Sequence, residues 1–167
     1  MPAKNPKDVF VTLMSEARNN TERTAKIYQE LSQEAQNPDV QENLEAQAFV
    51  TEKNLEALDR CFEIIGEKPQ ETNRCMHDVF VEDFKKELTE IESPPAKHLF
   101  MLAKATQLAH LRYAEYITLI TAAELTGHTV VGVLLESTLA DKLAFQERTQ
   151  RLIQNIIEGK MVARMVA

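Results

Sequence analysis

Apolar residues recur at intervals of three and four along the first third of the chain, the spacing that places side chains on one face of an α-helix. The first such stretch follows Asn5-Pro6, where an N-cap residue precedes a proline suited to the first helical turn. Asn37-Pro38-Asp39 ends this helix and caps a second one, which Gly66 closes. A connection this short makes the two helices antiparallel neighbours. Their apolar stripes are Phe10, Met14, Ala17, Ala25, Tyr28, Leu31 and Ala35, and then Val40, Leu44, Ala48, Leu55, Leu58, Phe62 and Ile65.

A shorter amphipathic segment extends from Met76 to Ile91, after Pro69 and before Ser93-Pro94-Pro95. We expect residues 67–95 to form a crossover along the outside of a bundle. A crossover of this length lets the long helices on either side of it run parallel, as in ferritin-like folds.

A third long helix is predicted from about Ala96 to Thr126 and a fourth from Thr129 to about Glu158, with Gly127-His128 between them. The third is apolar on two faces, so we expect its second face to meet either the crossover helix or another copy of the protein. The pattern therefore predicts an all-α fold. It is a ferritin-like four-helix bundle with an additional shorter helix in the crossover between helices two and three, formed by residues 1–167 as a single domain.

Composition excludes several classes of function but does not indicate a single one. The formal net charge of −7 has the wrong sign for a phosphate-binding surface, so we expect no nucleic-acid partner. No apolar run approaches the roughly 18 residues of a membrane span, and the amino end lacks the apolar core of a secretory signal. The chain has only two cysteines, Cys61 and Cys75, which cannot define a disulfide scaffold. We therefore expect a cytoplasmic protein with no membrane partner.

A bundle with one crossover can hold two metal ions between its helices. That site needs a glutamate from each of two helices and Glu-x-x-His, or a close variant, from each of the other two. No Glu-x-x-His occurs in this chain. We expect surface or capping positions for His77, His98 and His128, whereas His110 lies mid-helix and could face the core. No nucleophile with a neighbouring base and no glycine-rich phosphate loop is present, so no catalytic residue is predicted.

Acids are sparse where the middle of the bundle would lie, and each fits an ordinary solvated helix face as well as a metal site. Arg112 is unusual, because it falls between the two apolar faces of its helix at the depth expected for a metal-binding carboxylate. We expect no metal. If one binds, iron or manganese would be the cofactor, and the candidate ligands are Glu22, Glu52, His110, Glu115 and Asp141.

Several stretches resemble the YciE/YciF family of ferritin-like bacterial stress proteins, whose function is undetermined. The resemblance extends from about Asp8 to Ile153, and none of its matching stretches is a catalytic motif. These stretches are Asp8-Val9-Phe10 with Leu13, Glu63-Ile64-Ile65-Gly66-Glu67-Lys68-Pro69, Tyr113 to Leu119, and Leu134-Leu135-Glu136-Ser137-Thr138-Leu139.

The resemblance implies a di-metal carboxylate site with ligands from all four long helices, and this chain departs from it. The implied glutamate of the first helix falls on Thr21, with Glu22 beside it. Glu52 keeps an acid or histidine position one turn after the implied acidic pair of the second helix. The other implied ligand positions fall on Phe49 and Val50, on Ala109 and Arg112, and on Ala140, Asp141 and Lys142.

These departures lead to the hypothesis that the chain is a ferritin-like protein with a degenerate metal site. Thr21 and Arg112 would then replace the lost ligands, and we expect Arg112 to pair with Glu52 or Asp141, because a buried carboxylate without a metal or a cation is costly. On this hypothesis the protein acts by association, as a homodimer formed through helix three or the crossover.

Two alternatives remain open. One is an oxidoreductase or metal-handling protein that uses the five candidate ligands in a non-standard site. The other is a module that binds a small apolar ligand of unknown identity in the vacated centre, in a pocket lined by polar positions of the helix stripes. Those positions are Thr21, Gln47, Thr51 and Ser137.

Overall fold

The fold is all-helical, which confirms the predicted class. The computed structural model describes residues 5–71 and 76–157, and no β-strand occurs in these residues. The predicted tail after Glu158 and the side chains of Cys75 and His77 lie outside the described part. The helices are α1 (Pro6–Glu34), α2 (Pro38–Ile65), α3 (Met76–Thr89), α4 (Pro94–Leu125) and α5 (Thr129–Ile157).

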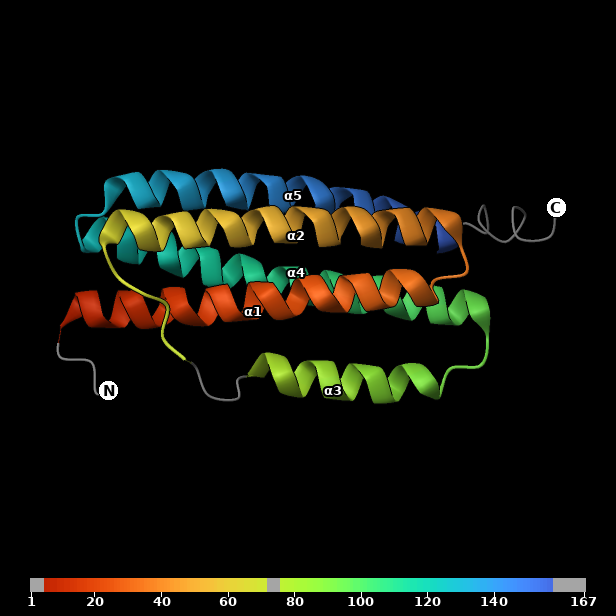
Figure 1. Cartoon of the computed structure of the whole chain (residues 1–167). Helices are drawn as coiled ribbons and strands as arrows, with labels where there is room; N and C mark the ends of the chain where they lie inside the picture. The colour runs from red at the N-terminus through yellow and green to blue at the C-terminus, as the bar shows by residue number, and fades with distance from the viewer. Residues whose placement is uncertain (1–4, 72–75, 158–167) are drawn as a thin grey trace.

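The four long helices pack in a closed ring. Helix α1 contacts α2, α2 contacts α5, α5 contacts α4, and α4 contacts α1. The shorter α3 lies outside this ring and packs against α4. Figure 1 shows α2 and α4 running in the same direction, with α3 bringing the chain back along the bundle between them. The arrangement agrees with a four-helix bundle whose second and third long helices are joined by a crossover.

The cap residues read from the sequence begin and end these helices. The Oδ1 atom of Asn37 accepts hydrogen bonds from the backbone N–H groups of Asp39 and Val40, at 2.9 and 3.2 Å. Gly66 ends α2 with φ of 68°, a left-handed conformation that glycine adopts without a side-chain clash. Each cap supplies partners for backbone groups that the helix itself cannot satisfy.

We expect Asn37→Ala to lower the free energy of unfolding by about 1 kcal/mol, because the first turn of α2 loses its side-chain acceptor. Urea unfolding followed by circular dichroism measures this change. Gln36→Ala, at the exposed preceding residue, is the control and should leave the free energy nearly unchanged. Equal values for the two variants would show that the cap contributes nothing.

The bundle core consists of two apolar clusters with a polar layer between them. On every long helix the residues of one cluster come first, buried polar residues follow, and the other cluster comes last. One cluster contains Leu31, Leu44 and Met101, and the other contains Phe10, Leu58 and Leu119. The buried polar layer consists of Asn20, Thr21, Thr24, Asn43, Gln47, Thr51, Asn54, Arg112 and Thr149.

Helix α3 covers only the first half of α4. The rings of Phe84 and Phe100 stack at 5.6 Å between centroids, and Lys104 of α4 forms an ion pair with Glu87 of α3 at 2.8 Å. Beyond this contact, Ile117 of α4 is exposed. The second apolar face predicted for this helix is thus covered by the crossover helix at one end and open at the other.

Candidate functional site

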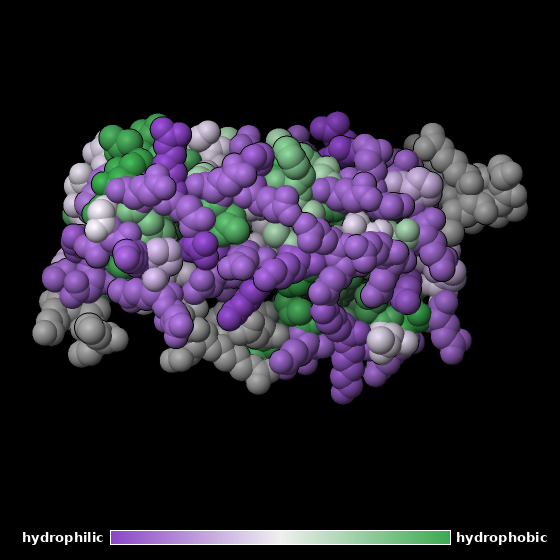
Figure 2. All heavy atoms as spheres, in the orientation of Figure 1, coloured by the Kyte–Doolittle hydropathy of each residue, from purple (hydrophilic) through white to green (hydrophobic). Residues whose placement is uncertain are grey.

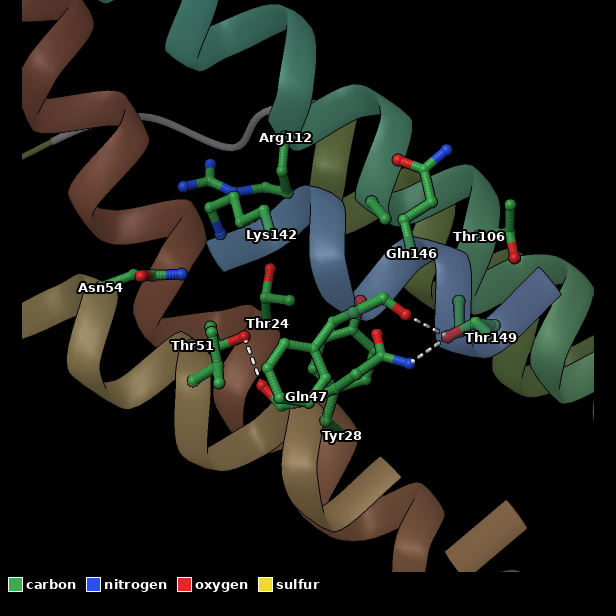
Figure 3. Close-up of a pocket in the computed structure, with 14 residues that line it drawn as sticks. Thr24, Tyr28, Gln47, Thr51, Asn54, Thr106, Arg112, Lys142, Gln146 and Thr149 are labelled. Atoms are coloured by element: carbon green, nitrogen blue, oxygen red, sulfur yellow. Dashed lines mark hydrogen bonds between the residues drawn. The ribbon is translucent and has the colours of Figure 1, made fainter. Parts of the chain in front are cut away.

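A partly open cavity of about 40 Å³ lies in the polar layer, lined by residues of α1, α2, α4 and α5. Figure 3 shows its lining side chains converging from these helices. Polar uncharged side chains and apolar ones share the lining, and its charged members are two cations. The lining residues are Thr24, Tyr28, Gln47, Val50, Thr51, Asn54, Ala105, Thr106, Ala109, Arg112, Lys142, Phe145, Gln146 and Thr149.

Arg112 is the largest buried side chain of the layer, with 1% of its surface exposed. One terminal nitrogen, Nη1, donates to the carboxylate of Glu115, one turn further along α4. The other, Nη2, donates to the backbone oxygen of Ala17, at 2.8 Å, and to the hydroxyl of Thr21. Arg112 therefore joins α4 to α1 at the middle of the bundle, where burial strengthens each charged hydrogen bond.

Lys142 approaches the same place from α5. Its Nζ lies 4.9 Å from the centre of the Tyr116 ring, which Arg112 also faces at 5.6 Å. Burial, together with the positive charge of Arg112, lowers the pKa of Lys142 to about 7, although Glu115 acts in the opposite direction. Near neutral pH the cavity thus holds the permanent positive charge of Arg112, and a second positive charge whenever Lys142 is protonated.

A hydrogen-bonded trio closes one side of the cavity. Gln47 Nε2 donates to Asn43 Oδ1 at 2.7 Å and to Thr149 Oγ1 at 3.1 Å, and Thr149 Oγ1 donates to Asn43 Oδ1 at 3.2 Å. The trio holds α2 against α5. On the opposite side, the Nδ2 atom of Asn54 has no hydrogen-bond acceptor in the part of the chain that the structure describes.

The five candidate metal ligands do not converge on this cavity. Glu52, His110 and Asp141 are exposed, and the first two form hydrogen bonds to Gln29 and Gln146. Glu22 is partly exposed and pairs with Arg18 and Lys26 on the surface of α1. Glu115 is 31% exposed and is held by Arg112. No group of three or more His, Cys, Asp or Glu that could hold a metal ion occurs among the described residues.

Two expectations from the sequence need correction. The expected pairing of Arg112 with Glu52 or Asp141 is wrong: its carboxylate partner is Glu115, since residues three apart lie on adjacent turns of one helix. His98, expected near the surface, is buried with 3% of its surface exposed, and burial lowers its pKa. By contrast, Thr21 is fully buried at the position where the resemblance implied a glutamate.

Asn54 and Tyr28 were missed as site residues. A signal for Asn54 existed, because polar residues at 47, 51 and 54 of α2 follow the same helical face. Tyr28 looked like an ordinary stripe residue, and only the structure shows that it lines the cavity. Ser137, expected in a central pocket, is exposed instead.

The residues around the cavity do not fit a di-metal centre. Four positions at which the resemblance implied metal ligands line it, and they carry Val50, Ala109, Arg112 and Lys142. Two of these side chains have no lone pair to offer, Arg112 repels a cation, and Lys142 does so whenever its amine is protonated. A divalent ion would also need several carboxylate oxygens, and no acidic residue is among the described residues that line the cavity.

No helix in the described ranges is long and apolar enough to cross a bilayer. A search among curated proteins found no match.

Solved structures with the same fold are known. The E. coli stress protein YciF is similar with a TM-score of 0.87 at 23% sequence identity, over 93% of this chain and 99% of that one. YcfI of Rhodopseudomonas palustris gives 0.85 at 23% identity, over 89% of this chain and 95% of that one. A Xanthomonas campestris protein gives 0.74 at 14% identity, over 98% of this chain and 100% of that one.

Among protein families, the match is to one described as a domain of unknown function, DUF892, over residues 5–162. This match includes all five helices of the described residues. The chain therefore belongs to the DUF892 family, and its resemblance to the YciE/YciF proteins is confirmed.

Proposed function

We propose that this chain is a single-domain, ferritin-like bundle that lacks the di-metal centre of the pattern it resembles and acts by association rather than catalysis. The observation that carries the proposal is the position of Arg112 and Lys142, which line the cavity where metal ligands would be expected. The proposal assumes the reducing cytoplasm expected from cysteine usage, in which the buried Cys61 would stay a free thiol.

The positive charge of Arg112 supports the absence of a di-metal centre more strongly than the loss of any one acidic residue does. Two divalent cations beside a buried guanidinium would be repelled through a medium of low effective dielectric, where such repulsion is large. A nearby carboxylate, that of Glu115, already pairs with Arg112 and accepts a hydrogen bond from Asn20 at 2.9 Å. Recruiting Glu115 to a metal would leave the Arg112 charge buried and unpaired, which is strongly unfavourable.

The first test is metal content. Protein purified from a culture supplemented with iron and manganese is expected to contain far less than one ion of either metal per chain, as measured by mass spectrometry of the digested protein. Oxidation of added ferrous iron should match that of a protein-free control. Near-stoichiometric metal that disappears in Glu52→Ala or Glu115→Ala would defeat the proposal in favour of a non-standard metal site.

The open half of α4 supports association with a second copy. Tyr113 and Ile117 are exposed one turn apart, and the exposed residues between them and Glu124 are uncharged, although 27% of the whole chain is charged. Leu125 follows, and exposed Val130 and Val133 begin α5. Figure 2 shows a mostly hydrophilic face with a hydrophobic area at the end where α2 ends and α5 begins. A surface with little charge on a protein of net charge −7 lets two copies meet with little charge repulsion.

We expect Ile117→Glu to shift the protein from dimer to monomer, because the substitution would bury a carboxylate without a partner in an apolar interface. Light scattering coupled to size-exclusion chromatography measures the mass. Gln41→Glu, which adds the same charge at an exposed site on α2, should leave the dimer intact. A monomeric wild-type chain, or a dimer unaffected by Ile117→Glu, would contradict this choice of surface.

A further inference from the structure

The central cavity has a positive charge that its own lining does not balance. Arg112 and Lys142 line it, and no acidic residue does among the described residues. Glu115 compensates one of these charges from outside the lining, through Nη1 of Arg112. When Lys142 is protonated, one positive charge therefore remains without a counter-charge inside a protein whose net charge is −7.

Hydrogen-bond donors without acceptors accompany this charge. Arg112 Nε and Asn54 Nδ2 are both buried, in residues with 1% and 3% of their surface exposed. Neither has a partner within the described ranges, and no described carboxylate forms an ion pair with Lys142. Figure 3 shows Arg112, Lys142 and Asn54 reaching into the cavity from α4, α5 and α2. An unpaired buried donor is unfavourable, and two such donors that share one cavity with the Lys142 amine point to a common acceptor.

The size of the cavity limits what that acceptor can be. One buried water needs about 10 to 15 Å³ of cavity volume. A cavity of about 40 Å³ therefore holds about three waters, or one ion as large as three waters. Phosphate has four oxygens and no apolar group, so it would leave the apolar part of the wall without contact. Val50 and Ala109 add apolar contact on the wall. A carboxylate with one or two carbons matches the charge, the number of donors and the apolar wall.

We infer that the mid-bundle cavity binds one small carboxylate, of the size of formate or acetate, held by Lys142 Nζ, Arg112 Nε and Asn54 Nδ2. This inference rests on the proposed absence of a metal centre and names what the vacated centre takes instead. The di-metal pattern holds two cations with carboxylates. In this chain the same place would hold one carboxylate with cationic and amide donors.

Binding should depend on pH through Lys142. The charged and titratable groups that face it are Arg112, Glu115 and Tyr116 from α4 and Tyr28 from α1, whereas α2 faces it with the uncharged Asn54 and Thr51. Burial raises the pKa of Tyr116 to about 12 and that of Tyr28 further, so neither tyrosine titrates near neutrality. The carboxylate prefers the protonated amine, so affinity should be greatest below pH 7 and fall as pH rises above it.

The test is a titration with sodium formate and sodium acetate at constant ionic strength. Sodium gluconate is the balancing salt, because its polyhydroxy chain makes that anion too large for a cavity of about 40 Å³. Thermal unfolding and the ε-carbon NMR signal of Lys142 are the readouts. Wild-type protein should show a saturable rise in Tm and an upward shift of the Lys142 pKa with formate and acetate. The response should weaken as pH is raised from 6 to 9, a range chosen to span the Lys142 pKa of about 7.

Lys142→Met and Asn54→Leu should each weaken binding by about tenfold or more, while Lys26→Met, at an exposed lysine of α1, should leave it unchanged. The inference is overturned if neither salt raises Tm above the gluconate baseline, or if Lys142→Met responds like wild type. A metal-free protein with no response to either salt would overturn this inference alone. A protein with stoichiometric metal would overturn the proposed function as well.

Discussion

Replacing Arg112 by leucine is expected to destabilise the protein by about 3 kcal/mol, at the lower end of the range for breaking a buried ion pair because Glu115 stays partly exposed. The substitution leaves Glu115 without its cation and removes the donor that reaches the backbone oxygen of Ala17 on α1. It therefore loosens the contact between α4 and α1 at mid-bundle. Urea unfolding at pH 7 measures the change.

Two comparisons separate the ion pair from simple loss of packing. The double variant Arg112→Leu with Glu115→Leu should be more stable than Arg112→Leu alone, since no carboxylate is then stranded. Arg18→Leu, which breaks the more exposed pair with Asp59, should cost about 1 kcal/mol or less. An Arg112→Leu variant as stable as wild type would show that the guanidinium does not hold the bundle together.

Between pH 7 and 10.5 the free energy of unfolding of wild type should rise by about 3 kcal/mol relative to that of Lys142→Met. In the unfolded chain this lysine has its ordinary pKa of 10.5, and in the folded protein the pKa is about 7. Between these values the unfolded chain holds a proton that the folded chain lacks, so the wild-type protein gains stability as pH rises from 7 towards 10.5. The full difference would be about 5 kcal/mol, and the partial exposure of Lys142 reduces it.

The measurement is urea unfolding of both proteins at several pH values, in zwitterionic buffer without added small carboxylates. The free energy of unfolding of wild type should rise relative to that of Lys142→Met as pH rises above 7. Below pH 7 the difference between the two proteins should stay constant, because the lysine is protonated in both the folded and the unfolded state. Lys26→Met, at an exposed lysine, should follow wild type throughout. Parallel curves for wild type and Lys142→Met would mean that the amine is solvated rather than enclosed.

The helices were predictable because their signals are local. Caps such as Asn37 and breaks such as Gly66 lie within one or two residues of the ends they determine, and a period of three to four fixes the buried face. The prediction of Arg112 on an inward face used the same rule. Burial of Thr21 and Arg112 follows from helical position alone, without knowledge of what the neighbouring helix carries.

Partners across helices were less predictable. The sequence gives no direct measure of the rotation of one helix against another, so Glu52 and Asp141 seemed able to reach Arg112 although both are exposed. A neighbour on the same helix, Glu115, already satisfied that charge. Asn54 became a site residue only when the four long helices were placed around one cavity, since its sequence signal indicates burial and not what it faces.

We propose that cationic and uncharged side chains occupy the place where metal ligands would lie. A crystal structure of protein soaked with iron and with manganese, with data collected at the absorption edge of each metal, tests it most directly. We expect no anomalous peak in the cavity between Arg112, Lys142 and Asn54, and we expect density there for a small planar anion or for water. Two peaks bridged by Glu22, Glu115 and Asp141, with Arg112 turned outward, would contradict the claim.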